Sequence, residues 1–160
     1  MSRHLLVMPC SARKLTAPGL LPARVRYDGS SWRTLRRNWR NVEHLVDLVV
    51  LSAEHGFILG DTPIPDYYRK LDKRRALDIV LDISAPWLAD RARDTEGRIF
   101  LMGSVLYRST MVQAIGPAFV ERRRAAGRLA WPVSHGEHEP GIGEQLAELK
   151  RFLRSIRETI

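Results

Sequence analysis

The sequence predicts a small, doubly wound α/β domain with a mostly parallel sheet and helices on both faces. Four short apolar runs typical of strands alternate with segments whose apolar residues recur at helical spacing. Strands joined by helices of this length pair in parallel through right-handed crossovers. The chain has 160 residues with no low-complexity linker and no internal repeat, so we expect a single domain over residues 1–160.

The predicted strands end where an apolar run changes to small and polar residues. They are His4–Cys10, Asp47–Ser52, Arg98–Met102 and Leu129–Val133. The first ten residues are apolar but lack the small-residue cleavage site of a signal peptide, and they continue directly into polar sequence. We therefore interpret them as the first strand.

Apolar residues at helical spacing predict four helices. They run from Ser30 or Ser31 to about Leu45, from Asp72 to Arg93, from about Tyr107 to Ala126, and from about Gly143 to Ile160. Pro86 should kink or divide the second helix, and Pro117 should break the third, because proline cannot donate an interior helix hydrogen bond.

Composition excludes several classes of protein. Hydrophobic residues make up 44% of the chain, which excludes a disordered tail, and no apolar run approaches the roughly 20 residues that span a bilayer. We expect no membrane partner. The single cysteine, Cys10, cannot form an internal disulfide and fits a reducing compartment, so we expect a cytoplasmic protein.

The net charge of +8 lies entirely in the first quarter of the chain. Residues 1–40 hold nine basic side chains and one acid, which indicates an anionic partner near the N-terminus. The first predicted helix carries four arginines that could follow the phosphates of DNA or RNA: Arg33, Arg36, Arg37 and Arg40. They could equally form a solvated face while Trp32 and Trp39 pack on the sheet.

Polar side chains gather after all four predicted strands. In open α/β sheets, ligands bind beyond the carboxyl ends of the strands, near the point where the strand order reverses. The candidates there are Cys10, Ser11, Arg13 and Lys14, then Ser52 and His55, then Gly103 and Tyr107, and finally Ser134 and His135. Ordinary turn chemistry is the alternative for the small polar residues, and a lone cysteine is commonly a small buried hydrophobe.

Lys14 is one of only four lysines in a chain with 22 arginines. An amine can lose its proton and attack an electrophile, or it can act as a compact charge on a phosphate. His55, oriented by Ser52 or Glu54, could serve as a general acid or base because imidazole titrates near neutral pH. We therefore place Lys14, His55, Ser52 and Cys10 in a predicted catalytic group.

No metal ion or organic cofactor is predicted. His135 and His138 are three residues apart, but one cysteine and no second cluster leave the signal weak. Neither glycine pattern of the nucleotide-binding loops occurs. The run Gly141-Ile142-Gly143 precedes the last helix and could present backbone N–H groups to an anion.

Several motifs together resemble a family of short bacterial and phage proteins often labelled YaaA-like, a label associated with peroxide stress. The motifs cover nearly the whole chain: Met8-Pro9-Cys10-Ser11-x-x-Lys14, Pro22-Ala23, Tyr27-x-Gly29-Ser30, Leu51-Ser52-Ala53-x-His55-Gly56, Ile64-Pro65-x-Tyr67, Gly103-x-x-x-Tyr107 and Gly141-Ile142-Gly143. We count Tyr27, Gly29 and Tyr67, which lie in these motifs, among the predicted substrate-binding residues.

Two shorter likenesses point toward nucleobases. Pro9, Cys10 and Lys14 are spaced as in the catalytic segment of archaeosine synthase, where a lysine attacks the nitrile of a deazaguanine base in transfer RNA; Leu15-Thr16 stand where that family has Pro-Tyr. The run Trp131-Pro132-Val133-Ser134-His135 is similar to the His-Pro-Ser turn of uracil-DNA glycosylases, although this chain lacks their aspartate after the first strand.

We therefore expect an enzyme that acts on a nucleobase or nucleotide, free or within nucleic acid, by cleaving or transferring at the N-glycosidic bond. Phosphate would be held by Lys14 and Arg13, and the base would stack on Tyr107 or Tyr67. The alternative is a non-catalytic nucleic-acid-binding protein that uses the basic N-terminal region. A third interpretation is a protein that binds an acidic partner surface.

Overall fold

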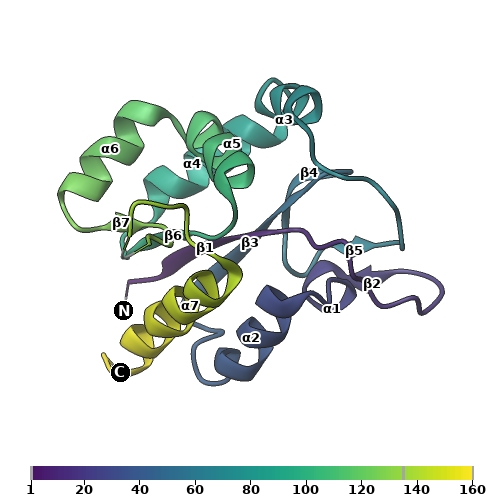
Figure 1. Cartoon of the computed structure of the whole chain (residues 1–160), viewed down its shortest axis with the longest axis horizontal. Coiled ribbons are helices and arrows are strands. Elements are labelled where there is room, and N and C mark those ends of the chain that lie inside the picture. The colour runs from purple at the N-terminus through teal and green to yellow at the C-terminus, as the bar shows by residue number, and fades with distance from the viewer. Residues whose placement is uncertain (1, 135, 160) are drawn as a thin grey trace.

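A sheet of five strands forms the centre of the molecule in the computed structural model, which describes residues 2–134 and 136–159 (Figure 1). The strand order is β4-β3-β1-β6-β7. The bounds are β1 His4–Pro9, β3 Val46–Ser52, β4 Gly56–Leu59, β6 Ile99–Leu101 and β7 Leu129–Ala130. Only β4 pairs antiparallel, which confirms the predicted mostly parallel sheet.

Helices cover both faces of this sheet, as the sequence predicts (Figure 1). One face carries α3 Lys73–Val80, α4 Ser84–Asp94, α5 Val105–Ile115 and α6 Pro117–Ala125. The other carries the short α1 Ala23–Arg26 together with α2 Ser30–Trp39 and α7 Ile142–Arg157. None of the helices in the described part of the chain combines the length and the apolar character that a bilayer crossing requires.

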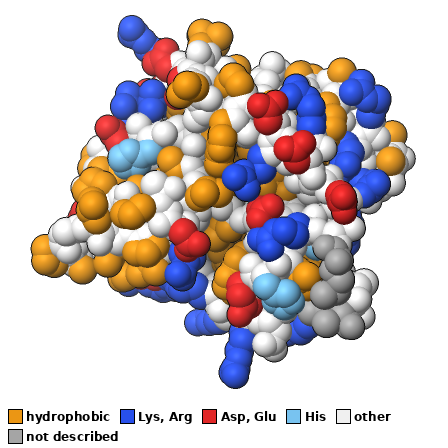
Figure 2. All heavy atoms as spheres, turned by 180° about the vertical axis from the view of Figure 1, so that it is seen from behind, with side chains coloured by type: hydrophobic (Ala, Val, Ile, Leu, Met, Phe, Trp, Pro, Cys, Tyr) orange, Lys and Arg blue, Asp and Glu red, His pale blue; other side chains and the backbone are white. Residues whose placement is uncertain are grey.

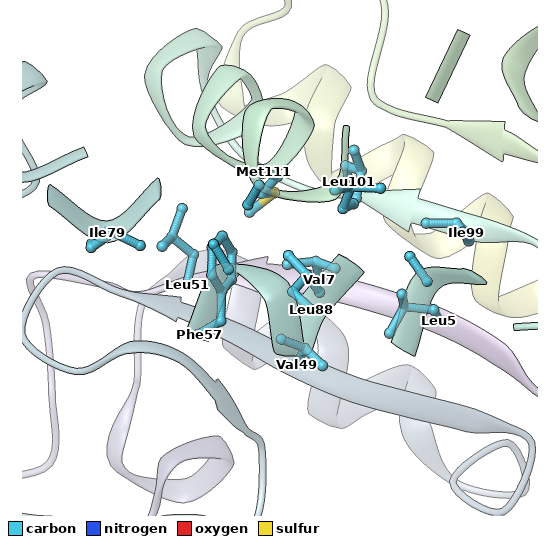
Figure 3. Packing of buried hydrophobic residues seen from close by; sticks show 14 of the residues in the cluster. Leu5, Val7, Val49, Leu51, Phe57, Ile79, Leu88, Ile99, Leu101 and Met111 are labelled. Atoms are coloured by element: carbon cyan, nitrogen blue, oxygen red, sulfur yellow. The ribbon is translucent and has the colours of Figure 1, made fainter. Parts of the chain in front are cut away.

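The central strand β1 is buried on both sides. Leu5 and Val7 belong to the apolar cluster on the α3–α6 side, whereas Leu6 and Met8 belong to the cluster on the α2–α7 side. Successive side chains of a strand point to opposite faces, so a strand covered on both faces has to be continuously apolar. Figure 3 shows the first cluster, which joins Val7 to Met111 and other helix residues.

The predicted helix ends differ from the observed ones at the N-terminal helix. α2 ends at Trp39 instead of continuing to Leu45, and the chain passes through Asn41 with φ 72° before β3 begins. A left-handed residue of this kind terminates a helix. Val42 and Leu45 are nevertheless buried, so their apolar character reflects a packed turn and not a helix face.

The two prolines lie in the first turns of new helices. Pro117 is the first residue of α6, so the predicted break there is confirmed. Pro86 lies in the first turn of α4, and the division between α3 and α4 comes earlier, around Asp82, whose carboxylate accepts a hydrogen bond from the Ser84 amide at 2.7 Å. Proline is tolerated in the first turn because the amide it lacks has no partner within the helix.

Three short strands are absent from the sequence prediction. β4 forms a hairpin with β3, and β2 Leu21–Pro22 pairs with β5 Pro63–Ile64 in a separate antiparallel sheet. Strands of two to four residues carry too little periodicity to be detected. β7 in turn ends at Ala130, three residues before the predicted end at Val133.

Arg26 anchors the loop between β1 and β2. Its side chain is fully buried, and its two terminal nitrogens donate hydrogen bonds to the carbonyls of Leu15, Ala17 and Gly19 at 2.6, 2.8 and 2.6 Å. A weaker bond of 3.4 Å reaches the Ile64 carbonyl in β5. One guanidinium therefore holds the loop that follows Lys14 and links it to the small sheet.

We expect Arg26→Met to lower the free energy of unfolding by about 3 kcal/mol, because it keeps an unbranched stem but leaves several buried carbonyls without a donor. Urea unfolding monitored by circular dichroism measures this change. The exposed Arg37→Met is the matched control and should shift stability by less than about 0.5 kcal/mol. Equal stability of the two variants would contradict the anchoring role of Arg26.

Candidate functional site

A cavity of about 500 Å³ lies beyond the carboxyl ends of β1 and β6. In the strand order, β1 lies between β3 and β6, so successive crossovers run to opposite sides of β1. This reversal is where open α/β sheets bind ligands. The lining residues are Cys10, Ser11, Ala12, Lys14, Tyr68, Arg69, Lys70, Leu71, Ser104, Leu106 and Tyr107.

The loop after β1 is held by bonds to neighbouring elements. The Pro9 carbonyl accepts a hydrogen bond from the Trp32 indole at 2.9 Å, and the Cys10 amide donates to the Leu51 carbonyl at 3.0 Å. The Ser11 hydroxyl donates to the Arg13 carbonyl at 2.6 Å and accepts from the Gly29 amide at 3.3 Å. The predicted binding residue Gly29 is not among the lining residues; a Cβ there would lie 2.9 Å from that of Ser11, so it shapes the loop.

The turn after β6 brings α5 close to the end of β1. Gly103 has φ 134°, and a Cβ there would lie only 2.9 Å from the Cβ of Tyr107. Glycine therefore permits a close approach that another residue would block. As a result, the Tyr107 hydroxyl shares a hydrogen bond of 3.2 Å with the Cys10 sulfur. These two predicted residues, 97 positions apart, meet in the cavity.

Lys14 reaches the cavity without a carboxylate partner among the described residues. Its Nζ lies 4.3 Å from the centre of the Tyr67 ring, and its one hydrogen bond, to the Ala12 carbonyl, is long at 3.5 Å. Burial lowers the pKa of Lys14, and the nearby Cys10 and Asp66 oppose this shift only in part. The neutral, nucleophilic amine is therefore more populated than in a solvated lysine.

A layer of hydroxyl groups supports the Tyr67 ring. The Tyr67 hydroxyl lies 2.6 Å from that of Tyr27 and 3.0 Å from that of Ser52, which also accepts a hydrogen bond from the His55 amide at 3.1 Å. Burial raises the pKa of Tyr27 to about 12 and raises the pKa values of Tyr67 and Tyr107 further. All three phenols therefore remain neutral around pH 7.

The predicted catalytic residues Ser52 and His55 lie beside Tyr67 and outside the cavity lining. Ser52 is fully buried beneath Tyr67, so it cannot contact a ligand in this structure. His55 packs edge-on against Tyr67 at 5.3 Å between ring centres and is not among the residues that line the cavity. Burial lowers the pKa of His55, and its Nε2 is buried without a hydrogen-bond partner. Both residues position Tyr67.

Two further predicted binding residues lie outside the cavity lining. Tyr27 is fully buried and packs against Trp32, so its predicted contact with substrate is wrong. Arg13 is largely exposed and forms a 3.5 Å ion pair with Asp28. Tyr67 is accessible, because it borders a second hollow of about 430 Å³ that Lys14 also lines.

The arginines of α2 are partly engaged within the protein. Arg33 and Arg36 both bind the carboxylate of Asp28, and Arg36 also donates to the Tyr27 carbonyl at 2.9 Å. The hydrogen bond from Arg33 lowers the pKa of Asp28. Arg37 and Arg40 are exposed. The predicted phosphate-binding face therefore has two of its four arginines bound to an acid of the same chain, while Trp32 packs in the core.

The fourth predicted strand end does not join the cavity. The chain leaves β7 at Ala130, and the Ser134 hydroxyl pairs with the His138 ring at 3.2 Å instead of lining the site. Ser134 therefore lies outside the cavity lining, and His135 lies outside the described residues. The N-terminus of α7 is occupied as well, because the Gly141 amide donates to the Glu144 carboxylate at 3.2 Å.

One wall of the cavity, the irregular segment between β5 and α3, is absent from the sequence prediction. It contributes Tyr68, Arg69, Lys70 and Leu71. The basic pair directly after the Ile64-Pro65-x-Tyr67 motif is the signal that could have found it. With Lys14, this wall gives the lining three cationic side chains and no acidic one.

A hollow of about 550 Å³ elsewhere is less suited to a charged ligand. It lies beside the start of β3, where Arg3 pairs with Asp47 and Arg24 with Asp61, both at 2.6 Å. Its charges neutralise one another, whereas those of the Lys14 cavity do not. Among residues 2–134 and 136–159, no group of three or more His, Cys, Asp or Glu side chains is arranged to hold a metal ion.

Comparison of the chain with protein-family models, with curated proteins and with solved structures finds no match. The resemblance to YaaA-like proteins therefore stays a prediction from the motifs.

We expect the Lys14 amine to lose its proton at a lower pH in the folded protein than in the protein unfolded by urea, because burial lowers its pKa. Acetylation over a pH series, with the modified lysine quantified by mass spectrometry, measures both midpoints. Asp66→Asn should lower the folded midpoint further, since Asp66 favours the charged amine. A folded midpoint at or above the unfolded one would contradict the burial of Lys14.

Proposed function

We propose that this protein is an enzyme that acts on a nucleobase or nucleotide by cleaving or transferring at the N-glycosidic bond. The observation that carries the proposal is the half-buried Lys14 amine, which borders a cavity with an aromatic and a thiol side chain and forms no ion pair in the described structure. A volume of about 500 Å³ suits a small organic ligand, since such sites span about 300–1,000 Å³.

In the covalent form of this reaction, the neutral Lys14 amine attacks C1′ of the sugar. A C1′–N bond to lysine forms while the C1′–N bond to the base breaks, and the base leaves with the electron pair. The resulting ammonium gives its proton to the base. Opening of the sugar ring yields an iminium, which water hydrolyses to free amine and sugar. The sum is one water consumed per base released.

The surrounding side chains supply position and charge. Tyr67, held by Tyr27 and Ser52, supports the amine from one side. The Tyr107 hydroxyl stays neutral and can donate a hydrogen bond that stabilises the negative charge developing on the base, and Arg69 and Lys70 can bind the phosphate of a nucleotide. In a second form of the reaction, Lys14 stays protonated and only stabilises that charge while water attacks C1′.

The motif likenesses support a nucleobase as the reacting group. Lys14 matches the position of the lysine that attacks a base in archaeosine synthase, although Leu15-Thr16 depart from that family. The motifs that resemble those of YaaA-like proteins contain Cys10, Ser11, Lys14 and Tyr107 of the cavity lining. We place the activity in the cytoplasm because a lone cysteine is usual for proteins of reducing compartments. The contacts of Arg33 and Arg36 with Asp28 weigh against the alternative, a non-catalytic nucleic-acid-binding protein.

We expect the wild-type protein to release a free base from at least one nucleoside, nucleotide or oligonucleotide, and Lys14→Ala to lower that rate at least about 100-fold. Mass spectrometry of the products, with both proteins run side by side, measures the rates. Lys73→Ala, an exposed lysine at the start of α3, is the matched control and should retain activity. Absence of base release by the wild type from every substrate would overturn the proposal.

If the amine attacks directly, borohydride added during turnover should reduce the iminium and leave a sugar adduct on Lys14. Peptide mapping of the trapped protein locates the adduct, and the Lys14→Arg variant should give none. Base release without any adduct would assign Lys14 the purely electrostatic role.

A further inference from the structure

The cavity walls divide into an apolar part and a cationic part. Leu71, Leu106 and Tyr107 present apolar and aromatic surface suited to a flat heterocycle. Arg69 and Lys70 present positive charge beside the Lys14 amine, and no Asp or Glu lines this cavity. A ligand that matches both parts carries an aromatic ring at one end and an anionic group at the other.

The cations are available to a ligand. Arg69 is paired only with Glu54, at 3.4 Å, and both side chains are about two-fifths exposed. Exposed pairs of this kind contribute little and exchange readily for a better anion. Lys70 forms no ion pair with any residue of the described chain. Ser104, which precedes the first turn of α5, makes no capping bond with its side chain, so the positive end of that helix adds to the field.

The arrangement of charge does not favour a long polyanion. A nucleic-acid strand needs several phosphate contacts along its path. The α2 arginines that could supply them lie on the opposite side of the sheet from α5, and two of the four are bound to Asp28. On the face shown in Figure 2, Lys and Arg side chains are interspersed with Asp and Glu and form no continuous basic track.

From these observations we infer that the cavity takes a free nucleotide, with its base against Leu71, Leu106 and Tyr107 and its phosphate at Arg69 and Lys70. The inference rests on the proposed function, which supplies the nucleotide as the class of ligand, and it deepens that function by excluding a base within DNA or RNA as the preferred substrate.

Isothermal titration of the full-length protein tests the inference without turnover. The ligands are the nucleoside monophosphates, the matching nucleosides, inorganic phosphate, and short single-stranded DNA and RNA. We expect one monophosphate to bind at least about tenfold more tightly than its nucleoside, phosphate alone or any oligonucleotide. Only a free monophosphate places a base on the apolar part of the cavity and a phosphate on the cationic part.

Two matched double variants locate the binding site. Arg69→Gln with Lys70→Gln should weaken binding of that monophosphate at least about tenfold, whereas Arg37→Gln with Arg40→Gln should leave it within about twofold. All four side chains lie outside the buried core, so both variants should fold, and circular dichroism checks this.

Three results would overturn the inference: tighter binding of an oligonucleotide that depends on Arg37 and Arg40, equal binding of a nucleoside and its monophosphate, or no binding of any monophosphate. The two proposals fail separately. A monophosphate that binds through Arg69 and Lys70 but never loses its base overturns the N-glycosidic reaction alone. Base release from oligonucleotides only overturns the free-nucleotide inference alone.

Discussion

The buried guanidinium of Arg26 is the contact on which the candidate site depends. A buried charge without a carboxylate partner is costly, and here the carbonyls of Leu15, Ala17 and Gly19 compensate it. The same bonds satisfy carbonyls in a loop that has no regular strand partner of its own. Because the loop follows Lys14 directly, and the fourth bond reaches β5 just before Tyr67, one side chain fixes both the amine and the ring beneath it.

The parallel sheet sets where that amine lies. β1 has parallel neighbours on both sides, so its carboxyl end opens into the space between two crossovers. The absence of a Cβ at Gly103 lets α5 start against Pro9, and Tyr107 thereby reaches Cys10. Cys10, near the N-terminus, and Tyr107, two-thirds along the chain, form one wall of the cavity, while the segment between β5 and α3 forms the other.

Burial gives this site its chemical character. The Tyr67 ring, whose hydroxyl is bonded to Tyr27 and Ser52, lies against the Lys14 amine, and burial favours the neutral form of that amine. The same desolvation keeps the tyrosines protonated. The site therefore combines a nucleophile that is more available than a surface lysine with neutral hydrogen-bonding phenols, and it places exposed cations at its edge.

The sequence by itself determined the fold class, the parallel strands and the presence of Cys10, Ser11, Lys14 and Tyr107 at one sheet edge, because apolar periodicity and strand ends are local features. Only the tertiary structure decided the depth of each side chain. It placed Ser52 and Tyr27 beneath the surface, kept Ser134 away, and brought in Arg69 and Lys70 from an irregular segment. How deeply a side chain is buried and which residues it contacts depend on residues distant along the chain, and no local pattern encodes such contacts.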